Sequence, residues 1–233
     1  STADNTIYFG GAVKNVVFTN NKVLACLAAR TVRAGKTLEG FVCSDNYFED
    51  GGYSFDWLRT DGAISGEVVI ENNVVKGSQQ SFIMFMAHGN GNFTIQNNKI
   101  YDMKCVAIDI RTTAGVKCTS TFNVIHNVLD NTNIGTTTVW KPVRFRFNDY
   151  TGETLDANVN LNVYINWGTT FLEDASGAKV GWVNMDNNYF DGLTADQLTA
   201  ENFDNIAASW ANPFTSVEAL EKSIPSVYDF AKY

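Results

Sequence analysis

The 233-residue chain is poor in the residues that build metal and redox sites. It contains only two histidines, His88 and His126, and four cysteines. Neither a C-x-x-C nor an H-E-x-x-H pattern occurs, and such spacings hold zinc in many proteins. The sequence therefore predicts no zinc site.

The cysteines themselves predict little chemistry. Cys43 occupies an apolar position of the repeat described below, and we interpret it as a small buried hydrophobe. Cys26 is followed by small residues and has the same interpretation. Cys105 and Cys118 flank a short segment, and the sequence leaves open whether they form a disulfide or stay free.

Long apolar runs and basic clusters are also missing. No apolar run reaches the about 18 residues of a membrane-spanning helix. The formal net charge is −8 and lysine is not clustered, whereas nucleic-acid binding depends on neutralising phosphates. The sequence thus predicts neither a membrane span nor a nucleic-acid partner. Few charges and many Asn and Thr residues favour an exported protein: secreted, periplasmic or at the cell surface.

What the sequence does contain is a short phrase that returns seven times. Each copy has two apolar residues in alternation and then an asparagine. In six of the seven copies an apolar residue follows two places after that asparagine. The asparagines are Asn21, Asn46, Asn73, Asn98, Asn127, Asn166 and Asn188. Their successive spacings are 25, 27, 25, 29, 39 and 22 residues. A period near 25 without helical spacing is typical of a β-solenoid.

The phrase around Asn73 illustrates the pattern. Val68, Ile70 and Val75 stand five before, three before and two after it, and only Gly168, after Asn166, breaks this apolar rule. Spacings of two place side chains on one face of a strand. Each unit is therefore predicted to contain a half-buried strand that ends in a turn.

The asparagine shares the parity of the apolar residues, so we expect its amide to point inward. Coils stacked about 4.8 Å apart would bring successive amides within hydrogen-bonding distance. We therefore predict an amide ladder along the solenoid. The preceding residue, such as Asn72, is usually polar, and we expect it to turn the chain through the left-handed region.

The phrases VVIENNVV (68–75), FTIQNNKI (93–100) and VNMDNNYF (183–190) resemble the repeat of the right-handed parallel β-helix, in the pectate-lyase-like superfamily. The resemblance covers about residues 7–192 and matches no specific enzyme family. It implies an all-β solenoid of about seven coils. It implies little about activity, because the superfamily includes lyases, hydrolases, adhesins and proteins of no known activity.

The two ends of the chain differ. Residues 1–192 carry the repeat, whereas 193–233 contain two segments with helix-capping patterns. The first segment begins at Thr194. The second begins at Thr215 or Ser216 and ends at Pro225. We predict a small helical cap there. No similar cap precedes the first coil. We therefore expect either a missing N-terminal segment of a larger protein or another chain to cover it.

Arginines recur at the end of the second strand predicted in four of the coils, as Arg30, Arg59, Arg111 and Arg146. Arg59 and Arg111 both stand 13 residues after a repeat asparagine, and Met86 takes the same place between them. Equal offsets predict one stripe along the solenoid. Because arginine binds carboxylates in a bidentate way, the stripe predicts a groove for an acidic polysaccharide. The predicted ligand-binding residues are Arg59, Arg111, Arg144, Arg146, Trp57 and Trp140.

The resemblance also suggests a catalytic alternative. Enzymes of the superfamily use arginine or lysine as a base and hold calcium with carboxylates, so the resemblance gives Arg111, Arg59, Asp109 and Asp56 as catalytic candidates. His88, at a predicted strand-to-turn boundary, is a separate candidate for a general base. Calcium is the only cofactor weighed, and no cluster of three carboxylates supports it. The structural alternative is that Arg59 pairs with Asp56 or Asp61 and Arg111 with Asp109, as a solvated charged face.

The long step before Asn166 predicts an insertion at about residues 131–160. It contains Trp140, Arg144 and Arg146, and the alternation around Phe145 predicts that part of it is a strand. Projecting loops often carry binding sites. Three functions stay open: a carbohydrate-binding or surface-displayed module without catalysis, a polysaccharide lyase or glycoside hydrolase, and a structural spacer.

Overall fold

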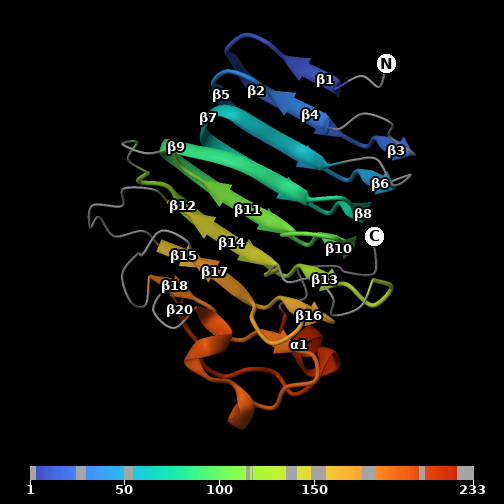
Figure 1. Cartoon of the computed structure of the whole chain (residues 1–233), viewed down its shortest axis with the longest axis vertical. Helices are drawn as coiled ribbons and strands as arrows, with labels where there is room; N and C mark the ends of the chain where they lie inside the picture. The colour runs from blue at the N-terminus through green and yellow to red at the C-terminus, as the bar shows by residue number, and fades with distance from the viewer. Residues whose placement is uncertain are drawn as a thin grey trace.

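The protein is a parallel β-solenoid of about six turns, close to the number of coils that the repeat predicts. In this computed structural model the described residues are 4–24, 30–49, 55–113, 116, 118–134, 141–147, 156–174, 182–204 and 208–224. The coils stack along the long axis of the molecule, with the N-terminal coil at one end (Figure 1).

All strand pairings are parallel, and the strands form two sheets. The 13-stranded sheet contains β1 (Asn5–Phe9), β2 (Val13–Thr19), β4 (Arg30–Ala34), β5 (Leu38–Ser44), β7 (Asp56–Glu71), β9 (Ser81–Gln96), β11 (Ile108–Arg111), β12 (Thr121–Ile125), β14 (Val143–Arg146), β15 (Asp156–Asn158), β17 (Leu172–Asp174), β18 (Val183–Asn184) and β20 (Ala208–Ser209). The seven-stranded sheet contains β3 (Lys22–Leu24), β6 (Tyr47–Glu49), β8 (Val74–Ser78), β10 (Lys99–Met103), β13 (Val128–Asp130), β16 (Val163–Ile165) and β19 (Tyr189–Phe190).

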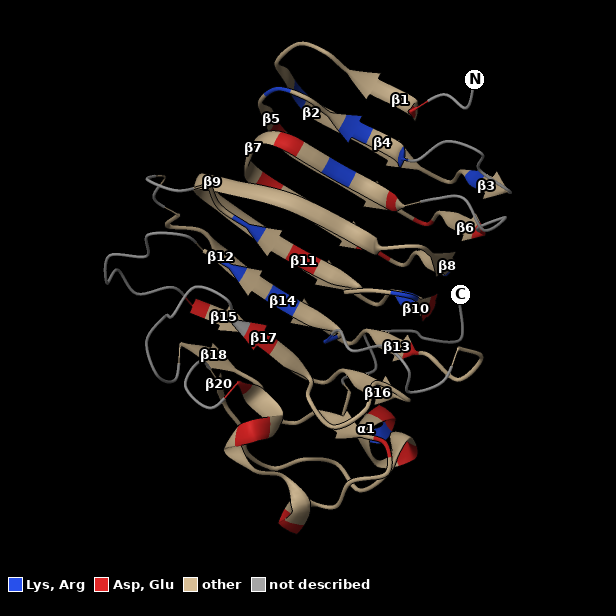
Figure 2. Ribbon diagram, in the orientation of Figure 1, with Lys and Arg blue, Asp and Glu red and all other residues tan. Residues whose placement is uncertain are grey.

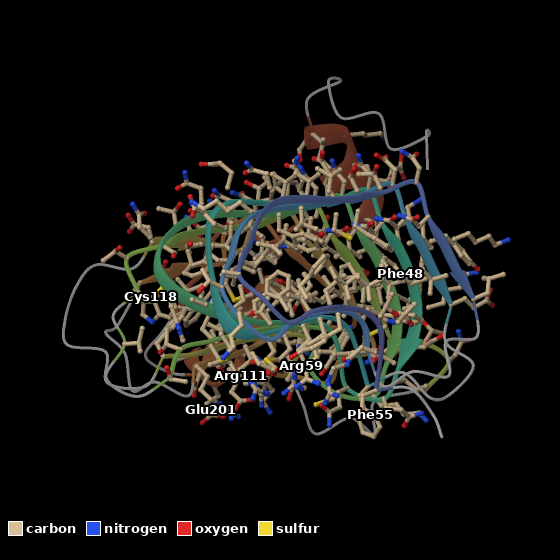
Figure 3. The ribbon with its side chains drawn as sticks, turned by 90° about the horizontal axis from the view of Figure 1, so that it is seen from above. Phe48, Phe55, Arg59, Arg111, Cys118 and Glu201 are labelled. Carbon is tan, nitrogen blue, oxygen red and sulfur yellow. The ribbon has the colours of Figure 1, made fainter. Side chains whose placement is uncertain are left out.

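The larger sheet has two arms, and the long strands β7 and β9 belong to both of them. β7 pairs with both β4 and β5, and β9 pairs with both β11 and β12. One arm therefore runs through β1, β4, β7, β9, β11, β14 and β17, and the other through β2, β5, β7, β9, β12, β15 and β18. Seen along the axis, the sheets enclose a core filled with side chains (Figure 3).

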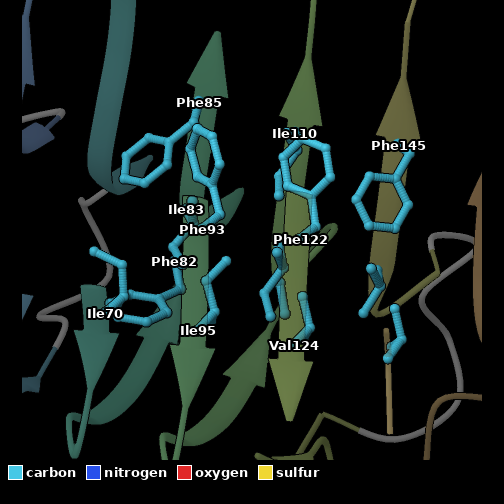
Figure 4. Packing of buried hydrophobic residues seen from close by; sticks show 14 of the residues in the cluster. Ile70, Phe82, Ile83, Phe85, Phe93, Ile95, Ile110, Phe122, Val124 and Phe145 are labelled. Carbon is cyan, nitrogen blue, oxygen red and sulfur yellow. The ribbon is translucent and has the colours of Figure 1, made fainter. Parts of the chain in front are cut away.

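The core consists of columns in which equivalent residues of successive coils stack. Phe41, Val68, Phe93 and Phe122 form one column in strand register, and none is more than 2% exposed. The rings of Phe93 and Phe122 lie 5.0 Å apart (Figure 4). The apolar alternation of the repeat therefore marks the buried side of the strands, as predicted.

The predicted amide ladder is present. Asn73 donates from its backbone N (3.1 Å) and its Nδ2 (2.9 Å) to Oδ1 of Asn98, and Asn98 does the same to Asn127. The ladder residues are Asn21, Asn46, Asn73, Asn98, Asn127, Asn162 and Asn188. Buried amides that satisfy one another in this way stabilise the turns without water.

Asn162, rather than Asn166, belongs to the ladder, so the sixth repeat was predicted in the wrong register. Asn162 accepts from Asn127 and donates to Asn188, whereas Asn166 donates to Oγ1 of Thr132. With Asn162 the exception at Gly168 disappears, because Tyr164 takes the apolar place two residues on and is 1% exposed. Asn162 and Asn166 share one strand parity, so alternation alone does not distinguish them.

The residue before each ladder asparagine adopts the left-handed conformation, as predicted. Its φ lies between 55° and 58° at Asn20, Asp45, Asn72, Asn97, His126, Leu161 and Asn187. Six of these seven are Asn, Asp or His, which tolerate this region. Leu161 is the exception, and leucine lacks the short polar side chain that lets Asn and Asp bond the local backbone in this conformation.

Replacing Leu161 with asparagine is therefore expected to raise the free energy of unfolding by about 1 kcal/mol, because a left-handed leucine is strained. Denaturant-induced unfolding followed by circular dichroism measures the change. Leu24→Asn is the matched control, because Leu24 is 50% exposed and does not have positive φ. An equal gain from both substitutions would show that hydrophobicity rather than backbone strain is responsible.

Short helices cover the C-terminal coil. Two 3₁₀-helices, η2 (Ala195–Gln197) and η3 (Ala200–Phe203), precede one α-helix, α1 (Val217–Ser223). Oγ of Ser216 accepts a hydrogen bond from the backbone N of Ala219, which confirms the predicted cap of α1. Phe203 is buried and packs on Phe190 with ring centroids 5.5 Å apart. The division at residue 192 into two domains stays a prediction, and Pro225 lies outside the described residues.

None of the described helices is long and apolar enough to cross a membrane.

Candidate functional site

All six arginines of the chain lie on four strands of one arm of the larger sheet. Arg30 and Arg33 are on β4, Arg59 is on β7, Arg111 is on β11, and Arg144 and Arg146 are on β14. We call these six residues and their carboxylate partners the arginine face (Figure 2). The protein has a net charge of −8, yet all of its arginines lie on one face. The carboxylates or ligands that balance these positive charges must therefore lie at the same face.

Strand register explains how the face is built. One outward column passes through Tyr8, Arg33, Arg59, Met84, Asp109, Arg144 and Glu173, one residue per coil. A second column, two residues further along each strand, places Met86, Arg111 and Arg146 side by side. Neighbouring members are about 4.8 Å apart, which is the distance between paired strands.

The N-terminal half of the face is an ion-pair network. Nη1 of Arg59 lies 2.9 Å from Oδ2 of Asp56, and its Nε lies 2.7 Å from Oδ1 of Asp61. Arg33 Nε donates to the other oxygen of Asp61 at 2.6 Å. Arg30 lies 4.0 Å from Asp56. The predicted pairing of Arg59 with Asp56 or Asp61 is thus confirmed for both carboxylates.

The centre of the face is a buried ion pair. Arg144 donates from Nη2 (2.6 Å) and Nε (3.2 Å) to the two oxygens of Asp109, and Glu173 lies 3.7 Å from its Nη1. The side chains of Asp109 and Arg144 are 0% and 4% exposed. Arg111 also donates from Nε to Asp109, at 2.7 Å, as predicted. Arg144, which was predicted to bind ligand, is therefore buried and engaged by Asp109.

Two buried aspartates of the face have opposite pKa shifts. Burial raises the pKa of Asp56 above its usual value, and the arginines around it only partly offset this. Burial also disfavours the charged form of Asp109, but hydrogen bonds from Arg144 and Arg111 outweigh it and hold the pKa of Asp109 below its usual range. Asp109 is therefore a firmly ionised partner, whereas Asp56 holds its charge less firmly.

Arg111 and Arg146 are two adjacent cations with little carboxylate compensation between them. They are register partners on β11 and β14, and both are partly exposed. Arg111 shares its one carboxylate, Asp109, with the bidentate Arg144, and no ion pair joins Arg146 to any carboxylate of the described residues. Burial, followed by repulsion from Arg144 and Arg111, lowers the pKa of Arg146. An anion placed here would relieve that repulsion.

The predicted stripe is real, but its register was wrong. Arg59 is in register with Met84 and Asp109, and Met86 pairs with Arg111, so Arg59 and Arg111 belong to different columns. Arg59 follows its ladder asparagine by 13 residues, whereas Met84 and Asp109 follow theirs by 11. The connection that precedes β7 is thus two residues longer than the equivalent ones. The midpoint of the face is apolar, because β9 contributes Met84 to one column and Met86 to the other.

The two tryptophans give different outcomes. Trp57 was predicted to stack on sugars, but it is 0% exposed, and its Nε1 donates to the carbonyl of Gly77 at 2.8 Å. Its ring packs on Phe48 at 5.2 Å, so it belongs to the core. The prediction failed because Trp57 is next to the bend into β7, where alternation does not fix the direction of a side chain. Trp140 lies outside the described residues.

His88 lies at the far end of the same face, two residues after Met86 on β9. Its Nε2 accepts a hydrogen bond from the backbone N of Thr113 at 3.2 Å. Burial lowers its pKa, so the ring is neutral at neutral pH. The bond to Thr113 occupies the lone pair that a general base would use.

Sequence reasoning missed several residues of the face. Arg33 and Glu173 stand in the main column, and Tyr8 begins it, with its ring 5.6 Å from the guanidinium carbon of Arg33. Tyr8 is 55% exposed. Asp61 was considered only for Arg59, although it also pairs with Arg33. Aligning strand starts instead of asparagine offsets would have found these residues.

Other predicted chemistry has less support among the described residues. No group of three or more His, Cys, Asp or Glu side chains that could hold a metal ion occurs there, so calcium stays a hypothesis without a site. Cys105 and Cys118 are both free thiols, which resolves that alternative. Two surface grooves, along Asn20, Asp45 and Asn72 and along Val17, Gly40 and Gly66, have no arginine in their lining.

A scan of the chain against protein-family models found no match, and searches of curated proteins and of solved structures found none either.

Proposed function

We propose that this β-solenoid binds an acidic polysaccharide along its arginine face. The adjacent, partly exposed Arg111 and Arg146 carry the proposal, because together they have only a share of one carboxylate among the described residues. Guanidinium groups bind carboxylates with two parallel hydrogen bonds, so a uronate residue suits such a pair.

The shape of the face favours a polymer over a small molecule. Small ligands bind in concave pockets, whereas the arginine face is the outer surface of the arm of the sheet that runs through β4, β7, β9, β11 and β14. Tyr8 and Phe55 are 55% and 45% exposed and add apolar rings near the arginines. Phe55, Arg59 and Arg111 project from the same side of the solenoid (Figure 3). Exposed aromatic rings can stack on sugar rings.

The sequence resemblance supports the same proposal. The repeat resembles that of the pectate-lyase-like superfamily, whose enzymes bind polysaccharide on an outer strand face. Export to the cell surface or beyond would place the protein where such polymers occur, and this localisation is part of the proposal.

Binding without catalysis has more support than cleavage. Asp56 and Asp109, the carboxylates proposed for catalysis, are each 0% exposed and engaged by arginines. A catalytic acid or base must be within reach of the substrate. The lyase or hydrolase alternative is tested by incubation with uronate polymers, with and without calcium. New double-bond absorbance or new reducing ends would favour it over simple binding.

The binding proposal predicts that the protein is retarded in gels containing polygalacturonate or alginate but not in gels containing a neutral glucan. Changing both Arg111 and Arg146 to glutamine is expected to weaken uronate binding at least about tenfold, since each charge-assisted bond contributes roughly 1.5–3 kcal/mol. The retardation should also decrease as salt is raised.

The matched control is Lys76→Gln with Lys99→Gln, which removes the same charge from the seven-stranded sheet. This variant is expected to bind uronate polymers as the unchanged chain does. Equal weakening by both double variants would indicate a general charge effect. Equal retention in neutral and acidic gels would contradict the proposal and favour a structural spacer.

A further inference from the structure

The N-terminal half of the arginine face has more arginines than carboxylates. Arg30, Arg33 and Arg59 share two ion-pair partners among the described residues, which are Asp56 and Asp61. Arg59 joins the two, since its Nη1 lies 2.9 Å from Asp56 and its Nε lies 2.7 Å from Asp61. The charge state of each carboxylate therefore decides how much net positive charge this half of the face presents.

The two buried aspartates of the face are held very differently. Asp109 accepts hydrogen bonds at both oxygens, from Arg144 at Oδ1 and Oδ2 and from Arg111 at Oδ2. Asp56 accepts one hydrogen bond, from Nη1 of Arg59 to its Oδ2. Its Oδ1 is buried and has no hydrogen-bond partner among the described residues. Because hydrogen bonds favour the charged form of a buried carboxyl group, the anion of Asp56 is the less stable of the two.

Arg30 is the cation that Asp56 holds least firmly. The two residues are register partners on β4 and β7, but Nε of Arg30 lies 4.0 Å from Oδ2 of Asp56, which is too far for a hydrogen bond. Burial and repulsion from Arg59 and Arg33 lower the pKa of Arg30, and Asp56 offsets this only in part. The side chains of Arg30 and Arg59 are 21% and 23% exposed, so both reach the solvent.

Asp56 is the carboxylate of this face that responds first to acid. Burial raises its pKa, and the surrounding arginines offset this only in part. Burial also disfavours the charged form of Asp61, but hydrogen bonds from Arg59 and Arg33 outweigh it and lower the pKa of Asp61. The pKa of Asp109 is lowered as well. Of these three aspartates, Asp56 therefore takes up a proton first as pH falls.

The groups around Asp56 come from three strands and one turn. The charged and titratable ones among the described residues are Arg30 and Arg33 on β4, Arg59 and Asp61 on β7, Asp109 and Arg111 on β11, and Cys105 before β11. Burial raises the pKa of the Cys105 thiol, so it is uncharged at neutral and acidic pH. β9 places the uncharged Ser81 in register with Asp56. Asp56 is thus the member of this set whose charge changes in mild acid.

We propose that Asp56 makes the affinity of the arginine face for an acidic polysaccharide depend on pH. When Asp56 takes up a proton, Arg30 and Arg59 lose its negative charge, and the face gains one net positive charge and binds a polyanion more tightly. This inference rests on the proposed function of the same face. Arg59 lies two strands from Arg111, about 10 Å, and projects from the same side of the solenoid, so one polymer reaches both (Figure 3).

The test compares the unchanged chain with Asp56→Asn and Asp61→Asn, at neutral pH and at about pH 4, near the usual pKa of aspartate. The probe is dextran sulfate, because its sulfate esters stay ionised at both pH values, and its affinity is measured at constant ionic strength. Asp56→Asn removes the charge at every pH without changing the size of the side chain. Asp61→Asn is the matched control, because it removes one charge from the same network, yet the lowered pKa of Asp61 keeps that charge in the unchanged chain at the acidic pH.

Asp56→Asn is expected to bind dextran sulfate about threefold more tightly than the unchanged chain at neutral pH, an effect typical of one partly exposed charge. At about pH 4 this advantage should disappear, because the unchanged chain has then lost the same charge, whereas the advantage of Asp61→Asn should persist. No advantage of Asp56→Asn at neutral pH, or an equal advantage at both pH values, would overturn the proposal. Failure of the unchanged chain to bind at either pH would contradict the proposed function itself, and the pH dependence with it.

A second measurement needs no variant. If the protonated form binds the polymer more tightly, the bound polymer must raise the pKa of Asp56 by the same factor. Carbon-13 NMR of the carboxyl groups in the unchanged chain, titrated with and without dextran sulfate, is expected to show this rise at Asp56. Glu49, on β6 of the seven-stranded sheet, is the internal control and should move less. A pKa of Asp56 that the bound polymer leaves unchanged would overturn the proposal.

Discussion

Replacing Asn98 with alanine is expected to lower the free energy of unfolding by about 3–5 kcal/mol. Asn98 is 0% exposed and lies at the centre of the amide ladder. Its loss leaves the backbone N and Nδ2 of Asn73 without their acceptor and the carbonyl of Ile70 without its donor. Each unsatisfied buried group costs roughly 1–3 kcal/mol. Chemical denaturation followed by circular dichroism measures the change.

Two further alanine variants make this expectation specific. Asn166→Ala is expected to change the free energy of unfolding by less than about 0.5 kcal/mol, because Asn166 is outside the ladder and contacts the exposed Thr132. Asn21→Ala, at the half-buried end of the ladder, should lie between the two. A cost for Asn166→Ala as large as that for Asn98→Ala would contradict the register in which Asn162 is the sixth ladder residue.

Removing the charge of Asp109 is the second large effect. Asp109→Ala removes the carboxylate to which the buried guanidinium of Arg144 donates two hydrogen bonds, and Glu173 lies 3.7 Å from that guanidinium. Truncating one partner of a buried ion pair typically costs about 3–5 kcal/mol, mostly because the other charge remains buried and unpaired. The double variant Asp109→Leu with Arg144→Met removes both charges and is expected to regain most of the loss. Thermal unfolding of the three proteins checks this.

The pH dependence follows from the pKa of Asp109. Its folded pKa lies below the usual value, so its contribution to stability is fully present above that usual value and is lost as pH falls through the folded pKa. Asp109→Asn should therefore lose less stability on acidification than the unchanged chain. Asp56 has the opposite sign: its pKa is raised, so its contribution is greatest at acidic pH and decreases as pH rises. Identical acid profiles for the Asp109→Asn variant and the unchanged chain would show that the pair does not depend on this charge.

The fold was largely predictable because the repeat is local. Alternation around residues such as Val68 and Ile70 fixes the buried side of a strand, and a left-handed turn followed by an inward asparagine needs only neighbouring residues. The error at Asn166 arose where a longer coil removed the spacing as a guide. There the apolar Tyr164 was the signal that distinguished Asn162.

The candidate site was less predictable, because a surface in a solenoid is assembled across coils. Whether Arg59 shares a column with Asp109 or with Arg111 depends on how many residues each connection uses, and the connection before β7 uses two more than those before β9 and β11. Burial was also invisible in the sequence: Arg144 and Trp57 are residue types common in binding surfaces, but both are buried, Arg144 on the outer face of the sheet and Trp57 in the core.

The sequence by itself determined that this chain is a β-solenoid with an amide ladder, because those features repeat within each coil of about 25 residues. Only the tertiary structure decided which arginines remain accessible and which carboxylates they share. Both depend on the register between coils, where a shift of two residues keeps every side chain on its face but changes all of its neighbours.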